Sequence, residues 1–168
     1  PMSWAASTCY THVISASHRR GSPARLLPAA RADYFPKLKL LGFSQSEDVL
    51  HMRSGLEQLH QNRPIECGDG GTTFRFLALR ASRVPGQHVL RGSKRLMSRP
   101  HQTLMQIFEQ LGVKAQLGSE ELVINSRGWQ KPQNYLKLSL AESSQFASGV
   151  FLNAWDLDFS LEYRIEED

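Results

Sequence analysis

Apolar and polar positions alternate in several short stretches, and this alternation predicts β-strands. The stretches are residues 10–15, 37–43, 87–91, 135–140 and 157–165. Residues 113–117 and 121–125 alternate as well, and Gly118-Ser119 between them predicts a hairpin. Successive side chains of a strand point to opposite faces, so each stretch offers one apolar face to a core.

Four other segments carry apolar residues at the spacing of an amphipathic helix, at positions 46–59, 72–82, 98–111 and 143–153. Ser44 or Ser46 is the expected N-terminal cap of the first. For the third we expect Ser98 as the cap, Pro100 in the first turn and Gly112 as the stop. The expected inward-facing side chains include Val49, Met52, Leu56, Leu59, Phe74, Leu77, Ala78, Leu104, Ile107, Phe108 and Leu111.

The order of these elements predicts a mixed α/β domain and argues against a helical bundle or a β-sandwich. Strand, helix, strand, helix and two strands follow one another, which fits a repeat of roughly 60–70 residues. The length of 168 residues suits a single domain over residues 1–168. Residues 17–32 are interrupted by Pro23 and Pro28, so we expect a loop or a disordered, divergent stretch there.

The cysteine count and the hydropathy of the chain limit which classes of protein and which cellular compartments fit the sequence. Cys9 and Cys67 allow at most one bridge, which excludes a disulfide scaffold. No apolar run approaches the roughly 20 residues that span a bilayer, and no secretory signal is visible, so we expect a cytoplasmic protein. Neither the histidines nor the cysteines have metal-ligand spacing, which predicts no metal site. Cys67 is expected to be a buried structural residue, because no basic partner adjoins it.

Charge is distributed unevenly along the chain, whose formal net charge is +4. Basic residues dominate positions 19–39, whereas acidic residues dominate positions 142–168, where a solvated acidic tail is one interpretation. Arginine and aromatic residues do not interleave as they do in RNA-recognition modules. The pattern therefore favours small polyanions over nucleic acid as partners.

The first candidate anion site is the glycine-rich loop at residues 68–71, which leads directly into an expected helix. Glycines let a ligand approach the backbone, and the first N–H groups of a helix have no partner. An ordinary tight turn is the alternative. Arg75 lies in the first turn, where a cation opposes the helix dipole unless an anion binds or Glu66 or Asp69 pairs with it.

Two further expected helix starts carry similar groups. Cations gather around the helix expected from Ser98, and they repel one another unless an anion binds or the cluster is simply solvated; they are Arg91, Lys94, Arg95 and Arg99. Ser143, Ser144 and Gln145 open the last helix, where they can cap it or hold a phosphate. Three such starts favour a small polyanion such as a phosphorylated carboxylic acid.

Four stretches carry a family resemblance in the right order: SEDVLHMRSGL (46–56), GDGGTTFRFL (68–77), RLMSRPHQTLMQIFEQLG (95–112) and SSQFASGVFLNA (143–154). Together they resemble the enolpyruvyl transferases, and within them the 5-enolpyruvylshikimate-3-phosphate synthase family (3-phosphoshikimate 1-carboxyvinyltransferases). The resemblance covers roughly residues 10–165, which is only the N-terminal portion of a family chain. It implies an inside-out α/β barrel built from βαβαββ units.

The resemblance also implies a reaction of aromatic amino acid biosynthesis. Phosphoenolpyruvate would give its enolpyruvyl group to the 5-hydroxyl of shikimate 3-phosphate, with no metal or organic cofactor. Residues expected to face phosphoenolpyruvate are Gly71, Thr72, Arg99 and Gln145. Residues expected to hold shikimate 3-phosphate are Ser143, Ser144 and Gln145, together with His18 and Arg25, while Arg75 and Arg95 would support the site.

The chain departs from the family pattern in two places. Where the family has a substrate-binding Lys and Arg, residues 15–27 offer His18 or Arg20 and then Arg25, and a mostly neutral imidazole would hold phosphate less well. Asp69 replaces an Asn and would repel phosphate. The acid and base groups of catalysis are expected in a second domain or chain, so we expect negligible turnover by this chain alone.

Two alternatives stay open from the sequence. A UDP-N-acetylglucosamine enolpyruvyl transferase shares the implied fold, but its nucleophilic Cys is missing, because no Cys lies between Arg91 and Pro100. A non-catalytic basic module that binds RNA would account for the positive charge of residues 19–39.

Overall fold

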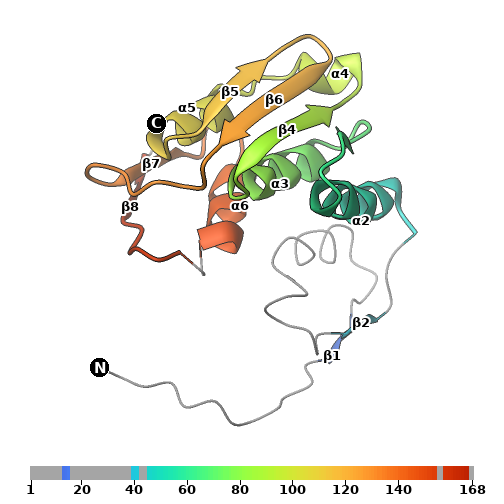
Figure 1. Ribbon diagram of the computed structural model, residues 1–168, viewed down its shortest axis with the longest axis horizontal. Coiled ribbons are helices and arrows are strands. Elements are labelled where there is room, and N and C mark those ends of the chain that lie inside the picture. The colour runs from blue at the N-terminus through green and yellow to red at the C-terminus, as the bar shows by residue number, and fades with distance from the viewer. Residues whose placement is uncertain (1–12, 16–38, 42–44, 155–156, 167–168) are drawn as a thin grey trace.

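The structure is a computed structural model, and it describes residues 13–15, 39–41, 45–154 and 157–166 (Figure 1). The elements in chain order are β1 (Val13–Ser15), β2 (Lys39–Leu41), α2 (Glu47–His60), β3 (Ile65–Glu66), α3 (Gly71–Ser82), β4 (Gly86–Arg91), α4 (Lys94–Met97), α5 (Gln102–Gln110), β5 (Lys114–Leu117), β6 (Glu121–Ser126), β7 (Leu136–Ser139), α6 (Gln145–Ala154) and β8 (Tyr163–Glu166). The stretch at 17–32 lies outside the described residues. Among those described, no helix is long and apolar enough to cross a membrane.

A four-stranded sheet with the order β3-β4-β6-β5 forms one side of the described structure. Strands β3 and β4 are parallel, whereas β6 pairs antiparallel with both β4 and β5. The predicted hairpin around Gly118-Ser119 is therefore confirmed. From β3 to β6 the elements follow the order strand, helix, strand, helix, strand, strand, with the short α4 added, and this confirms the mixed α/β class.

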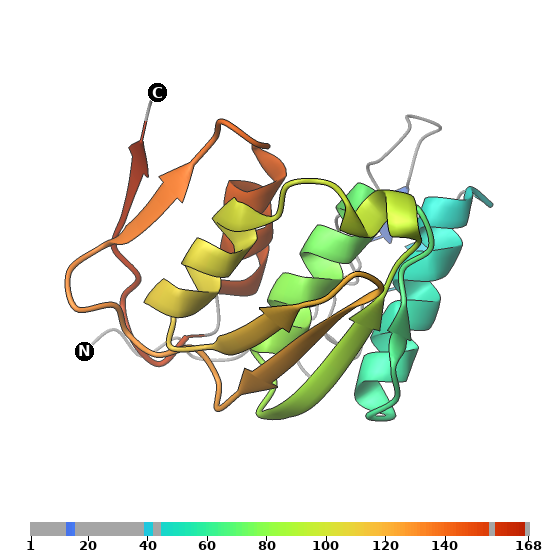
Figure 2. The ribbon, with the colours of Figure 1, turned by 90° about the horizontal axis from the view of Figure 1, so that it is seen from above.

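Helix α3 is the centre of the packing. It contacts β4 and β6 of the sheet, and α2 and α6 flank it (Figures 1 and 2). Because it has neighbours on several sides, eight of its twelve residues are buried, Thr73 and Ser82 among them. Phe74, Leu77 and Ala78 are fully buried, as the sequence predicts, and Phe76 and Leu79 are buried with them.

Strands β7 and β8 are also parallel, and α6 connects them, so β7–α6–β8 repeats the arrangement of β3–α3–β4. Helix α6 approaches α3 closely at Gly149, where a methyl group would lie 2.5 Å from Leu79 Cδ1. A larger residue would force Leu79 out of its position. Glycine at this point therefore lets the two helices pack side by side.

The helix predicted over residues 98–111 is wrong at its start. Ser93, not Ser98, provides a cap: its Oγ accepts a hydrogen bond from the Leu96 N–H at 3.2 Å, and the short helix α4 ends at Met97. Pro100 has no N–H and disfavours helical geometry at Arg99, so the chain is interrupted before α5 begins. Arg99 consequently lies in the α4–α5 connection and not in the first turn of a helix.

The strand predicted over residues 157–165 is also shorter than expected. Pairing with β7 begins only at Tyr163, which lies opposite Leu136. Leu157, Phe159 and Leu161 are partly buried against the core, which accounts for their alternation without strand pairing. The two-residue strand β3 was not predicted at all, because so short a segment carries no periodicity.

A substitution at Leu79 tests whether the packing of α3 against α6 stabilises the fold. We expect Leu79→Ala to lower the free energy of unfolding by about 2–5 kcal/mol, because it leaves a cavity in the α3–α6 contact. Leu50→Ala is the matched control on a helix, because Leu50 is 45% exposed on α2 and its loss costs under about 0.5 kcal/mol. Urea unfolding measures both, and equal losses would contradict the packing described here.

Candidate anion-binding site

The N-termini of α3 and α6 meet through the side-chain amide of Gln145. Its Nε2 donates a hydrogen bond to Thr72 Oγ1 at 2.9 Å, and its Oε1 accepts one from Arg75 Nη1, also at 2.9 Å. Both bonds are partly buried and join residues 70 and 73 positions apart in the sequence. The structure thus brings together three residues that the sequence singles out in two separate motifs.

Two guanidinium groups converge at the start of α3. A methyl group on Gly71 would lie 2.8 Å from Arg99 Nη1 and 3.6 Å from Arg75 Nη1, so glycine at this position lets the Arg99 guanidinium lie against the start of α3. Among the described residues, neither Arg75 nor Arg99 has a carboxylate within salt-bridge distance. Two cations and the free N–H groups of a helix N-terminus therefore share one place, which is the charge pattern of an anion site.

Arg75 is held by burial and stacking as well as by Gln145. Its guanidinium lies 5.0 Å from the centre of the Phe146 ring, a cation–π distance. Burial lowers the pKa of Arg75 from its usual range, the neighbouring Arg99 lowers it further, and Glu142 opposes both. Its Nε is buried without a hydrogen-bond partner among the described residues. The guanidinium is therefore placed where an anion would relieve an unfavourable charge.

The alternative in which Arg75 pairs with Glu66 or Asp69 is wrong. Glu66 lies 3.7 Å from Arg91, and Asp69 accepts a hydrogen bond from the Ser93 hydroxyl. Both carboxylates are thereby directed toward other groups. The glycine-rich loop bends at Gly68, whose φ of 59° is favourable only for glycine, and this turn carries Asp69 toward Ser93.

The cation cluster expected between Arg91 and Arg99 is largely neutralised. Arg91 also lies 3.5 Å from Glu121, and Lys94 lies 3.8 Å from Glu120, all at the surface. Arg95 is exposed on α4, and its side chain has no described partner. Three of the four cations thus fit the alternative of a surface cluster, and of the four only Arg99 lies beside Gly71 and Arg75.

At α6, Ser143 and Ser144 have different surroundings. Ser143 Oγ accepts a hydrogen bond from the Gln145 N–H at 3.2 Å, so Ser143 caps the helix. Ser144 is exposed, and its hydroxyl has no partner among the described residues. The cap and the free hydroxyl lie beside the amide of Gln145.

Glu142 is a member of the site that sequence reasoning missed. Both of its carboxylate oxygens lie within hydrogen-bond distance of the Thr103 N–H, at 3.3 and 3.4 Å, in the first turn of α5. Its charge also acts on Arg75. An acidic residue directly before Ser-Ser-Gln was the available signal. The interpretation of residues 142–168 as a solvated tail is wrong for Glu142, whereas Glu166 is exposed and lies 3.4 Å from Lys137 in a surface ion pair.

The other candidates are packing residues or lie outside the described structure. Cys67 is fully buried, as expected, and burial raises the pKa of its thiol to about 12. Trp129 is buried and donates a hydrogen bond from Nε1 to Ser82 Oγ at 2.8 Å. His18, Arg20 and Arg25 are not among the described residues. Among those that are, no three metal-ligating side chains gather.

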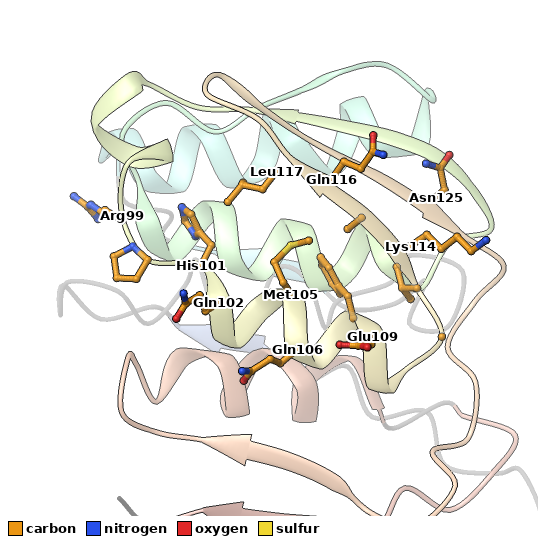
Figure 3. A pocket seen from close by; sticks show the side chains of 15 residues that line it. Arg99, His101, Gln102, Met105, Gln106, Glu109, Lys114, Gln116, Leu117 and Asn125 are labelled. Carbon is orange, nitrogen blue, oxygen red and sulfur yellow. The ribbon is translucent and has the colours of Figure 1, made fainter.

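A groove of about 1190 Å³ runs between α5 and β5, and Figure 3 shows Arg99 and His101 at one end of it. Met105 and Phe108 of α5 and Leu117 of β5 are among the side chains that line it. Lys114 and Asn125 lie toward the opposite end. The groove thus adjoins the anion site only through Arg99 and His101.

A comparison with family models decides the family. The model for EPSP synthase (3-phosphoshikimate 1-carboxyvinyltransferase) matches residues 32–158. The chain belongs to the EPSP synthase family. The resemblance seen in the four sequence motifs is therefore confirmed.

Curated relatives agree with this EPSP synthase assignment. The 3-phosphoshikimate 1-carboxyvinyltransferase of Clostridium novyi is 32% identical over 98 residues, which are 58% of this chain and 22% of that protein. The protein of the same name from Pyrococcus abyssi is 31% identical over 98 residues, which are 58% of this chain and 23% of that protein. That of Clostridium beijerinckii is 27% identical over 72% of this chain, and 26% of its own length is covered. The chain thus spans about a quarter or less of these EPSP synthases.

Solved structures agree in fold. An EPSP synthase from Acinetobacter baumannii has a TM-score of 0.63 at 16% identity, over 84% of this chain and 37% of that one. A second structure of the enzyme from this organism gives the same TM-score at 17% identity. The expected enolpyruvyl transferase-like α/β fold is confirmed by this similarity.

The two hydrogen bonds of the Gln145 amide, to Thr72 and Arg75, predict that removing this side chain destabilises the fold. We expect Gln145→Ala to lower the free energy of unfolding by about 1–3 kcal/mol, because Thr72 and the half-buried Arg75 each lose a hydrogen-bond partner. Gln106→Ala, at an exposed position of α5, is the control and should change it by under about 0.5 kcal/mol. Chemical denaturation checks both variants. An unchanged free energy of unfolding in Gln145→Ala would contradict a stabilising role for these two hydrogen bonds.

The pKa of Cys67 predicts an inert thiol. With a pKa of about 12, the group is protonated at pH 8, and only about one molecule in ten thousand carries the reactive thiolate. In a Cys9→Ser background, where Cys67 is the remaining cysteine, we expect no measurable alkylation by iodoacetamide in the native state and full alkylation in guanidinium. A native rate within tenfold of the unfolded rate would contradict the burial of this residue.

Proposed function

We propose that this chain supplies part of the substrate site of an EPSP synthase. The complete enzyme would transfer the enolpyruvyl group of phosphoenolpyruvate to the 5-hydroxyl of shikimate 3-phosphate, and inorganic phosphate would leave. The observation that carries the proposal is the Gln145 amide, which joins Thr72 and Arg75 beside Arg99. The same amide connects the two helix N-termini at which two different phosphorylated substrates would be held.

In this proposal the start of α3 receives phosphoenolpyruvate. Arg99 and the backbone at Gly71 and Thr72 face its anionic groups, and Arg75 supports them through Gln145. A planar guanidinium suits this work because it can form two parallel hydrogen bonds to a carboxylate or a phosphate. Because Gly71 has no side chain, the Arg99 guanidinium lies directly over the start of α3, where an anion could contact it and the backbone N–H groups together.

The start of α6 would hold the phosphate of shikimate 3-phosphate. The free hydroxyl of Ser144 supplies a hydrogen-bond donor. Ser143 caps the first turn of the helix by accepting a hydrogen bond from the Gln145 N–H. Gln145 then lies between the two substrates. We propose that the acid and base groups come from outside these 168 residues, because the chain spans about a quarter or less of its curated relatives.

Ligand-induced thermal stabilisation tests the proposal. We expect shikimate 3-phosphate, with a further gain from phosphoenolpyruvate, to stabilise the chain by about 2.7 kcal/mol at a hundred times the dissociation constant. Arg99→Gln should abolish the gain from phosphoenolpyruvate, and Ser144→Ala should weaken binding of shikimate 3-phosphate. Arg127→Gln is the matched control, at an exposed position after β6, and should leave both effects intact.

Three outcomes would refute this function. The first is the absence of any shift with shikimate 3-phosphate, and the second is a shift that survives Arg99→Gln and Ser144→Ala unchanged. The third is equal stabilisation by UDP-N-acetylglucosamine or by generic RNA, which would favour one of the alternatives that the sequence leaves open.

A further inference from the structure

His101 is a buried imidazole with one ring nitrogen unused. The residue is 3% exposed, and its Nε2 lies 3.0 Å from the carbonyl oxygen of Leu96. A carbonyl can only accept, so Nε2 carries the proton and donates it. In the neutral ring Nδ1 is then a bare acceptor, and it is buried without a hydrogen-bond partner among the described residues. A buried polar atom without a partner needs an explanation.

The surroundings of His101 are those of the anion site. Its ring lies 4.9 Å from the ring of Phe74 in α3, centre to centre. The charged groups that act on it are Arg75 from α3, Arg99 from the α4–α5 connection and Glu142 from the β7–α6 connection. Figure 3 shows His101 next to Arg99 at the end of the groove.

We propose that His101 binds a proton at Nδ1 when an oxyanion binds beside Arg75 and Arg99, so that anion binding is coupled to proton uptake. The proton comes from a solvent or buffer acid, an N–H bond forms at Nδ1, and the imidazole becomes a cation. The unused acceptor becomes a donor, and the positive charge of the ring attracts the newly bound anion. This inference deepens the proposed function and rests on it.

The balance of charges around His101 supports this coupling. Burial lowers the pKa of His101, the bond to Leu96 raises it, Arg75 and Arg99 lower it, and Glu142 raises it. The imidazole is therefore neutral in the empty site at pH 7. An anion near Arg75 and Arg99 offsets the two contributions that lower the pKa, which favours protonation. By reciprocity, lowering the pH must strengthen anion binding.

Sulfate is a suitable probe, because its charge stays constant between pH 5.5 and 8. We expect calorimetry at pH 6.5, in buffers of different ionisation enthalpy, to detect uptake of a fraction of a proton, up to about one, for each sulfate bound. The dissociation constant should rise several-fold between pH 6 and pH 7.5 at fixed ionic strength, up to the roughly tenfold per pH unit of a one-proton coupling.

Variants identify the group that takes up the proton. His101→Gln can still donate to the Leu96 carbonyl but cannot titrate, so it should bind sulfate without proton uptake and without the pH dependence. His88→Gln is the matched control: His88 is also buried, and its Nε2 lies 2.9 Å from the carbonyl of Val84, which follows the C-terminal end of α3, whereas the site lies at the N-terminus of that helix. It should behave as the parent chain does. Glu142→Gln should reduce the uptake at a given pH, because the charge of Glu142 raises the pKa of His101.

The outcomes separate this inference from the proposed function. Sulfate binding without proton uptake, or uptake that persists in His101→Gln, overturns the coupling alone. Absence of sulfate binding at both pH values also overturns it, whereas the proposed function is decided independently by the response to shikimate 3-phosphate.

Discussion

The close contact between α3 and α6 is the constraint on which the site depends. Gly149 brings α6 against Leu79, and four residues earlier, one helical turn toward the N-terminus, Gln145 reaches Thr72 and Arg75. Because α-helix geometry fixes the distance between these two contacts, the packing in the core also fixes the separation of the two helix N-termini. The spacing of the proposed substrate groups is thus set by apolar packing rather than by a flexible loop.

The positive charges at the N-terminus of α3 repel one another when no anion is bound. Arg75 and Arg99 lie close together at a helix N-terminus, where the dipole already favours negative charge. Glu142 offsets part of the repulsion while its carboxylate caps α5. One carboxylate near two guanidinium groups leaves a net positive charge, which stabilises a bound anion without preventing the fold.

Local patterns in the sequence predicted most of the fold, and the failures share one cause. Helices α2, α3 and α6 follow from apolar periodicity, because each buries a regular face. Helix α4 was not predicted, and its cap, Ser93, makes a contact with Asp69, 24 positions away, that no local pattern shows. Pairing of Arg91 with Glu121, which is thirty positions away, is likewise invisible to any local pattern.

The contrast between local patterns and contacts of distant residues also explains which residues of the candidate site the sequence indicated. Gly71, Thr72, Arg99 and Gln145 were found because their motifs are local, whereas Glu142 and His101 belong to the site only through tertiary contacts.

Asp69 shows how a departure from the family pattern is accommodated. Its carboxylate accepts a hydrogen bond from the Ser93 hydroxyl, which also caps α4, and Asp69 directly precedes Gly70, the N-cap residue of α3. Two helix N-termini therefore favour its negative charge, and a neutral Asn would gain less from both. The carboxylate stabilises the glycine-rich loop, but the same charge competes with any anion at Gly71. Structural stability and anion affinity are thus opposed at this one position.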